Sequence, residues 1–227
     1  MQDLVKQVSR SFYLTLRILP RSIRPQLSLA YLLARASDTI ADTELIEARR
    51  RLEALRRFRS CVREACNGQK PGLPDLGDLA EAQTAGGGKG TPAERTLLQG
   101  IESLLESLRR FAAADRLLIG SVLETITRGQ ETDLTRFRDA AADRIAALDT
   151  DADLDAYTYA VAGCVGEFWT HMCRAHVFPR AALDDAALLA DGVRFGKGLQ
   201  LVNILRDLPR DLRQGRCYIP RDRLSGC

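Results

Sequence analysis

Aromatic residues and long apolar runs are both scarce in this sequence. Phe, Trp and Tyr make up 6% of the 227 residues. The longest apolar stretch, near Leu27 to Ala34, is far shorter than the roughly 20 residues that span a bilayer. The N-terminus does not show the pattern of a cleavable signal. The sequence therefore predicts a soluble chain, or one that meets a membrane only at its surface.

Paired cysteines and a strong excess of one charge are also missing. The six cysteines show no CxxC spacing, which argues against a zinc site or a disulfide framework and favours a reducing, cytoplasmic location. Likewise, His171 and His176 match no metal-binding spacing, and we interpret both as structural. Thirty-three Lys and Arg against 30 Asp and Glu give a net charge of +3, which is too small to indicate nucleic-acid binding unless the basic residues cluster.

Basic residues cluster only locally, between Ala48 and Arg59. Leu52 and Leu55 fall at helical spacing within this stretch. We interpret it as an amphipathic helix with a solvated cationic face. A phosphate- or membrane-binding patch is the alternative.

The apolar pattern is helical along the whole chain. Leu, Ala and Arg recur, whereas Val, Ile and Thr seldom alternate as strands require. Helical spacing predicts helices over residues 4–19, 23–40, 45–66, 97–111, 116–128, 154–175 and 186–207, and no convincing strand. With 45% hydrophobic residues, the chain is long enough for one substantial core. We therefore predict a single all-α domain over residues 1–227.

Residues 67–93 differ from the rest because glycine and proline interrupt them repeatedly. Such segments form turns and loops, so we predict a long surface loop here. Residues 86–91 place a lysine among glycines, as phosphate-binding loops do, but the P-loop spacing is absent and no strand is predicted before them. This run therefore indicates a flexible loop.

The first candidate site is a pair of carboxylates. Asp38 and Asp42 are four residues apart, so they share one face of the predicted helix, whose preceding turns are strongly apolar. Magnesium commonly binds through a few carboxylates together with substrate phosphates. The pair would form a diphosphate site if this face lines a cavity. By spacing alone, two solvated surface acids are the alternative.

The second candidate site is a polar stripe formed by Gln200, Asn203, Asp207 and Asp211, with spacings of three, four and four. Apolar residues flank the stripe, and buried carboxylates need a cation or a hydrogen-bond network. Pro209 predicts a kink between the two aspartates, which weakens the case for Asp211. A capped helix end with solvated acids is the alternative.

Two such clusters can hold magnesium ions that neutralise a diphosphate and let it leave an allylic carbon. Arg35 precedes the first cluster, while Arg206 and Arg216 border the second. Guanidinium groups suit bidentate binding of phosphate oxygens. For each arginine, a surface ion pair is the alternative.

These motifs resemble those of the squalene and phytoene synthases over the range from Ser9-Arg10-Ser11-Phe12 to Pro220. Residues 35–42 resemble the first aspartate-rich motif of that family, residues 203–211 its second, and residues 215–220 the tail of the second. Residues 157–166 resemble its tyrosine-containing helix, and residues 129–134 a short cavity motif.

The resemblance implies an all-α, isoprenoid-synthase-type helical bundle around a central cavity, with several Mg²⁺ ions. Asp38 and Asp42 would bind metal at one end of the cavity, and Asn203, Asp207 and Asp211 at the other. By the same resemblance, diphosphate would be bound by Arg35, Arg206 and Arg216, Tyr157 would lie near the reacting carbons, and Ser9, Phe12, Tyr31 and Gln200 would line the site. Core packing is the alternative for Phe12 and Tyr31.

The same resemblance implies a reaction. Two farnesyl diphosphates would condense head to head through presqualene diphosphate to squalene, with NADPH as reductant. Thr39, directly after Asp38, is more similar to squalene synthases than to typical phytoene synthases. The alternatives are synthesis of presqualene diphosphate, phytoene or dehydrosqualene without reduction, or a non-catalytic subunit that binds prenyl diphosphate. The chain ends at Cys227, whereas family members continue for several helices, so we expect that its last helices are lacking.

Overall fold

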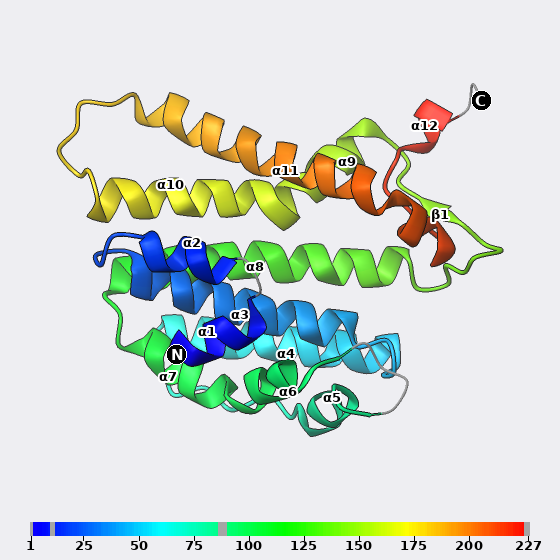
Figure 1. The fold of residues 1–227 in the computed structure, drawn as a ribbon, viewed down its shortest axis with the longest axis horizontal. Helices are drawn as coiled ribbons and strands as arrows, with labels where there is room; N and C mark the ends of the chain where they lie inside the picture. The colour runs from blue at the N-terminus through cyan, green and yellow to red at the C-terminus, as the bar shows by residue number, and fades with distance from the viewer. Residues whose placement is uncertain (1, 10–11, 86–89, 225–227) are drawn as a thin grey trace. The chain divides into compact units, whose positions relative to one another are not determined.

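A computed structural model describes residues 2–9, 12–85 and 90–224. Cys227 and residues 86–89 of the predicted glycine loop lie outside the described residues. Apart from two very short strands, the regular secondary structure of the described part is helical, so the predicted all-α class is confirmed (Figure 1). The predicted central cavity stays a prediction.

The helices in the described part of the chain are α1 (Gln2–Val8), α2 (Phe12–Ile18), α3 (Arg24–Asp42), α4 (Ala48–Cys66), α5 (Gly77–Ala82), α6 (Pro92–Gln99), α7 (Ile101–Arg109), α8 (Ala113–Arg136), α9 (Asp151–Thr158), the π-helix η1 (Tyr159–Gly163), α10 (Cys164–His176), α11 (Asp185–Arg213) and α12 (Arg221–Leu224). None of these described helices combines the length and apolar character needed to cross a bilayer.

Contacts between residues divide the chain into two compact units. The first unit comprises Met1–Thr127 and His171–Ala181, and the second comprises Arg128–Thr170 and Ala182–Cys227. Helices α8 and α10 each contribute residues to both units. The single domain inferred from the sequence stays a prediction.

Helix α3 supplies the centre of the first unit's core. Pro25 lies in its first turn, where proline fits a helix without removing a hydrogen bond. Leu29, Leu32 and Leu33 are fully buried, and α3 packs against α4, α6 and α7. Burial of each such side chain stabilises the fold by about 1.5–3 kcal/mol. This buried helix supports the polar residues at its C-terminal end.

A buried polar cluster joins three helices of the same unit. The carboxylate of Asp115 on α8 accepts a hydrogen bond from Nε2 of Gln26 on α3 at 3.0 Å. Its other oxygen lies 2.6 Å from Nε2 of His176 on α10. Because Asp115 is only 5% exposed, these partners compensate for its burial. His176 thus has a structural partner, as expected from the sequence.

The basic stretch on α4 is a solvated face only in part. Arg49 is 83% exposed. Arg50, in contrast, donates to the Asp78 carboxylate at 2.9 Å and to the Asp75 carbonyl at 2.8 Å. Arg51 donates to the Ala41 carbonyl at 2.6 Å. The run therefore also holds neighbouring segments against α4, a use that helical spacing does not reveal.

The predicted loop over residues 67–93 contains a helix, which corrects the sequence-based expectation. Helix α5 lies inside this segment, and Leu76, Leu79 and Ala80 bury their side chains. These apolar residues have helical spacing between breakers, so burial against the unit outweighs the local abundance of glycine and proline. A helix therefore occupies Gly77–Ala82 of the predicted loop.

Three predicted helices are divided, and two are longer than expected: α8 covers Ala113–Arg136 where residues 116–128 were predicted, and α11 covers Asp185–Arg213 where residues 186–207 were predicted. The first splits into α1 and α2 around Ser9, the fourth into α6 and α7 at Gly100, and the sixth contains the π-helix η1. Helix α11 continues through Pro209 to Arg213. Pro209 therefore does not end α11 between Asp207 and Asp211.

In the second unit, glycines allow α11 to approach η1 and α10 closely. A Cβ atom on Gly196 would lie 2.2 Å from the Ala162 carbonyl oxygen, and one on Gly166 would lie 1.9 Å from the Gly192 carbonyl oxygen. Both distances are far below van der Waals contact, so only glycine allows these helices to pack at this separation.

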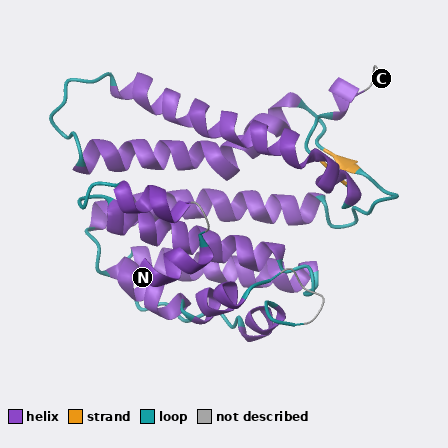
Figure 2. Cartoon of the chain, viewed as in Figure 1, coloured by secondary structure: helices purple, strands orange, loops and turns teal. Residues whose placement is uncertain are grey.

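A small parallel strand pair completes the second unit, although no strand was predicted. Strand β1 (Ala146–Ala147) pairs with β2 (Arg216–Cys217), as the orange ribbon in Figure 2 shows. Gly215, immediately before β2, has a φ of +76°, a conformation that glycine adopts without strain. Two residues per strand are too few for a recognisable alternating pattern. The pair directs the chain from α11 towards Tyr218.

Candidate active site

The C-terminal end of α3 carries one set of predicted site residues. Arg35 donates from Nη2 to Oε1 of Glu94 on α6, and its Nη1 lies 3.9 Å from Oδ2 of Asp38. The Asp38 side chain is 45% exposed, and Asp42, the last residue of α3, is also exposed. A guanidinium group held beside accessible carboxylates can bind phosphate oxygens close to a metal ion.

Glu94 was not predicted as a site residue. It belongs to the capping box of α6, in which the Thr91 hydroxyl accepts a hydrogen bond from the Glu94 backbone N–H at 3.2 Å. In return, Glu94 Oε2 accepts one from the Thr91 backbone N–H at 2.9 Å. The Thr-x-x-Glu spacing signals this cap. The pairing with Arg35 joins distant parts of the sequence, so no local pattern reveals it.

The residues predicted to line the site near the N-terminus include an aromatic pair and a buried serine. The rings of Phe12 and Tyr31 stack with their centroids 4.9 Å apart and an interplanar angle of 29°. Ser9 is 3% exposed, and its Oγ has no hydrogen-bond partner among the described residues. The stack itself is equally compatible with a substrate wall and with core packing, so their role stays a prediction.

In the second unit, Tyr157 joins the polar stripe of α11. Gln200 donates from Nε2 to the Tyr157 hydroxyl at 3.4 Å, and Asn203 donates from Nδ2 to Gln200 Oε1 at 3.3 Å. The sequence predicted Tyr157 from the motif at residues 157–166, and Gln200 and Asn203 from the polar stripe. The structure brings them together in one chain of hydrogen bonds.

Asp133 and Tyr218 extend this network, although neither was predicted as a site residue. The Tyr218 hydroxyl donates to the two oxygens of Asp133 at 3.1 and 3.0 Å. The ring of Tyr218 stacks on that of Tyr157 with centroids 4.5 Å apart. Nη1 of Arg216 lies 3.9 Å from Asp133 Oδ2. Asp133 falls within the motif at residues 129–134, and Tyr218 falls within the motif at residues 215–220. These two motifs are the sequence signal that could have identified them.

Burial raises the pKa of both tyrosines, and the negative charge of Asp133 raises each further. Both hydroxyls therefore stay protonated at neutral pH. They can donate hydrogen bonds and present neutral aromatic faces.

Replacing Tyr218 with phenylalanine should lower the free energy of unfolding by about 1–3 kcal/mol. The Asp133 side chain is only 21% exposed, so its carboxylate would lose a hydrogen-bond donor that water only partly replaces. Urea denaturation measures the change. In an Asp133→Asn background the same substitution should have a smaller effect, since the donor then faces a neutral amide. Equal effects in both backgrounds would contradict the assigned hydrogen bond.

The two aspartates of the α11 stripe have different environments. Asp207 accepts two hydrogen bonds from Arg206, at 2.8 and 2.7 Å, and these bonds lower its pKa. Burial raises the pKa of Asp211, and the charge of Asp207 raises it further, against opposing effects of Arg210 and Arg216. Asp211 is therefore a carboxylate whose charged form would be stabilised by a bound cation.

We expect Asp211→Asn to raise the stability of the metal-free protein at neutral pH. Because the pKa of Asp211 is raised in the folded state, its stabilising contribution is complete below the unfolded-state pKa and is lost as pH rises through the folded-state pKa. The gain should be modest, since Asp211 is partly exposed, and should shrink as the pH falls from about 8 to about 4. Urea titrations across this range measure the gain in stability.

Asp191→Asn, on the same helix with a side chain that is 68% exposed, is the control. A wild-type protein more stable than the variant at pH 8 would contradict the assignment.

The predicted residues thus fall into two sets, each within one unit. The first unit holds Ser9, Phe12, Tyr31, Arg35, Asp38 and Asp42; the second holds Tyr157, Gln200, Asn203, Arg206, Asp207, Asp211 and Arg216. Within the described ranges, no three Asp, Glu, His or Cys side chains form a ready-made metal site. The oxygen donors of each set nevertheless fit Mg²⁺, which typically takes one or two carboxylates and completes its shell with phosphates and water.

Comparison with known proteins identifies the family. A family model described as squalene/phytoene synthase matches residues 5–227. The chain belongs to the squalene/phytoene synthase family. Members of this family are prenyltransferases that bind prenyl diphosphates.

Relatives within the squalene/phytoene synthase family include both kinds of enzyme. A bifunctional lycopene cyclase/phytoene synthase of Blakeslea trispora is 30% identical over 96% of this chain and 32% of its own length. Squalene synthase ERG9 of Saccharomyces cerevisiae is 27% identical over 97% of this chain and 45% of its own length. A solved complex of TcSQS with the ligand BPH1237 has a TM-score of 0.70 and 26% identity over 97% of this chain and 57% of that chain. The chain therefore spans between about a third and just over half of the proteins it matches.

Proposed function

We propose that this member of the family condenses two farnesyl diphosphates head to head, through presqualene diphosphate, to squalene, with NADPH as reductant and Mg²⁺ as cofactor. The observation that carries the proposal is the network around α11, in which Tyr157, Gln200 and Asn203 are linked by hydrogen bonds. Asp207 and Asp211 follow on the same helix. We further propose that the protein works in the cytoplasm and meets a membrane at most at its surface.

Magnesium ions would be held by Asp38 and Asp42 in one set, and by Asn203, Asp207 and Asp211 in the other. When bound, they supply positive charge that neutralises the departing diphosphate. The raised pKa of Asp211 supports this assignment, because a buried carboxylate near another acid gains most from a cation.

The arginines would bind the phosphate oxygens. Glu94 and Asp38 orient the Arg35 guanidinium group on α3. Arg216 lies near Asp133, and Arg206 donates to Asp207. Each guanidinium group is held by a carboxylate, which reduces the entropy lost when it binds a diphosphate.

Tyr157 and Tyr218 would act on the carbon skeleton. Their stacked rings present an aromatic face, and such faces attract cations. Because both hydroxyls stay protonated, neither supplies an anion that would trap a carbocation prematurely. Gln200 would fix the orientation of the Tyr157 hydroxyl.

The test is pyrophosphate release from farnesyl diphosphate, measured with and without Mg²⁺ and with and without NADPH, followed by analysis of extracted products. Release that depends on Mg²⁺, with squalene formed only when NADPH is present, supports the proposal. Squalene formed without reductant would contradict it. Thermal stabilisation by substrate and Mg²⁺ without release would instead indicate a non-catalytic binding subunit.

A second candidate is synthesis of presqualene diphosphate, dehydrosqualene or phytoene without reduction. The 30% identity to a fungal protein that carries phytoene synthase activity in its name favours this group. Thr39 after Asp38 favours the squalene product. Product analysis separates the two, because the second candidate gives the same product whether NADPH is present or not.

A further inference from the structure

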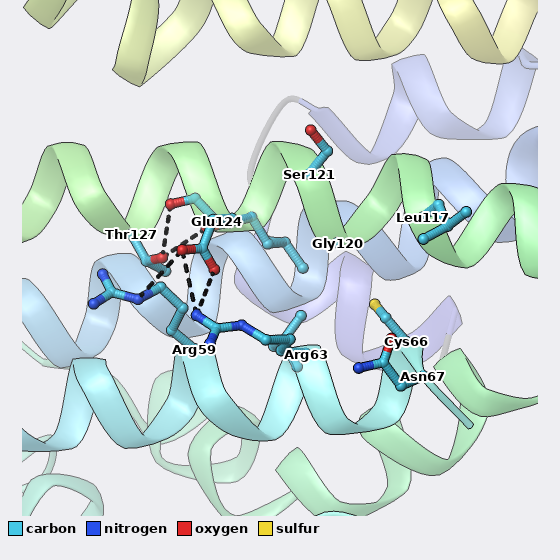
Figure 3. Close-up of a pocket in the computed structure, with 11 residues that line it drawn as sticks. Arg59, Arg63, Cys66, Asn67, Leu117, Gly120, Ser121, Glu124 and Thr127 are labelled. Carbon is cyan, nitrogen blue, oxygen red and sulfur yellow. Dashed lines mark hydrogen bonds and ion pairs between the residues drawn. The ribbon is translucent and has the colours of Figure 1, made fainter. Parts of the chain in front are cut away.

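A groove between α4 and α8 of the first unit shares no residue with the candidate active site. It has a volume of about 320 Å³ and is lined by one face of each helix (Figure 3). This volume is at the lower end of the range for small-molecule sites. The groove is therefore large enough for one small ligand.

One end of the groove is cationic. Arg63 donates to both oxygens of Glu124, at 3.2 and 3.4 Å, and Nε of Arg59 lies 3.9 Å from the same carboxylate. Figure 3 shows these three side chains gathered near Thr127. The described lining residues at this end include two arginines and one glutamate. Because the Arg63 side chain is 60% exposed, an anion from solvent can reach it.

The rest of the groove is apolar or neutral. Val62 and Leu123 are buried in its floor, whereas Leu117 on the rim is 64% exposed. At the far end, burial raises the pKa of the Cys66 thiol to about 11, and the thiol donates to the Arg116 carbonyl at 3.1 Å. The Cys66 thiol is therefore uncharged at neutral pH, so it lines the groove and does not act as a nucleophile.

Gly120 fixes the width of the groove at this end. A Cβ atom on Gly120 would lie 2.8 Å from the Cys66 sulfur, so the two helices approach closely at this point. The groove thus has an apolar end near Cys66 and Leu117 and an end lined by Arg59 and Arg63.

We propose that this groove binds a single-chain amphiphile with an anionic head group, such as an alkyl phosphate. The head group binds at Arg63 and Arg59, where charge-assisted hydrogen bonds form. The chain lies over Val62, Leu123 and Leu117 and removes the exposed leucine surface from water. Binding is reversible and forms no covalent bond.

Isothermal titration calorimetry with n-octyl phosphate in metal-free buffer tests the proposal. Arg63→Gln should weaken binding by about tenfold or more, because a charge-assisted contact is lost. Ser121→Trp should abolish binding by filling the groove from an exposed position on α8. Arg49→Gln, on the exposed face of the same helix, is the matched control and should bind normally. Inorganic phosphate and n-octyl glucoside should each bind much more weakly than n-octyl phosphate.

Three results would overturn the proposal. The first is equal affinity in Arg63→Gln and Arg49→Gln. The second is unchanged binding in a folded Ser121→Trp protein. The third is loss of binding in Asp207→Asn, which would place the ligand at the candidate active site. None of these measurements depends on turnover. A failure of the groove proposal is therefore distinct from a failure of the proposed function.

Discussion

Asp207→Ala should reduce Mg²⁺-dependent pyrophosphate release from farnesyl diphosphate by at least about 100-fold. Asp207 is the carboxylate of the α11 stripe with the lowered pKa, so it is ionised across the neutral range and ready to bind a cation. Its loss removes negative charge that, under the proposed function, holds the Mg²⁺ beside the departing diphosphate. A continuous pyrophosphate assay at saturating Mg²⁺ measures the change, and Asp38→Ala should produce a loss of similar size.

Asp191→Ala is the matched control for this experiment. Asp191 lies on the same helix, is 68% exposed and pairs only locally with Arg194, three residues away. Its replacement should leave release within about twofold of wild type, as expected of a surface substitution. Because Asp207 is also accessible, at 37% exposed, Asp207→Ala should keep the wild-type melting temperature within a few degrees. Normal release by the Asp207→Ala protein would contradict the proposed metal site.

Gly196→Ala should destabilise the protein by about 1–3 kcal/mol, whereas Gly198→Ala, two residues later, should stabilise it by about 0.5–1 kcal/mol. The added methyl group at position 196 would meet the Ala162 carbonyl oxygen at 2.2 Å. At position 198 nothing lies within 4 Å, so only the gain in helix propensity remains. Chemical denaturation monitored by circular dichroism measures both changes.

The opposite signs make this pair a sharp test of the packing of α11. Both substitutions are the same chemical change on the same helix, so helix propensity cancels between them. A stabilising Gly196→Ala would mean that α11 does not approach η1 as closely as the structure shows. A destabilising Gly198→Ala would mean that a partner covers this face of the helix in solution.

The sequence predicted the helices and the two acidic motifs because both depend on local spacing. The apolar residues of α3 predicted its burial, and four-residue spacing placed Asp38 and Asp42 on one face. The spacing of three and four residues likewise identified Gln200 and Asn203. Residues on one helix keep their relative positions whatever the tertiary fold.

The parts that sequence could not predict depend on contacts between distant segments. Tyr218 meets Asp133 across 85 positions, and Arg35 meets Glu94 across 59. Helix α5 was missed because its three buried residues are surrounded by breakers. Helix propensity depends only on the local sequence, and burial in the tertiary structure can override it.

The π-helix η1 changes which side of the chain faces α11. In a regular α-helix each residue turns by about 100°, so Tyr157 and Gly166, nine positions apart, would point to opposite sides. Yet Tyr157 contacts Gln200 and Gly166 contacts Gly192, both on α11. The wider π turn rotates less per residue and reduces this angular difference. The π turn thus acts as a rotational offset that lets Tyr157 and Gly166 face the same neighbouring helix.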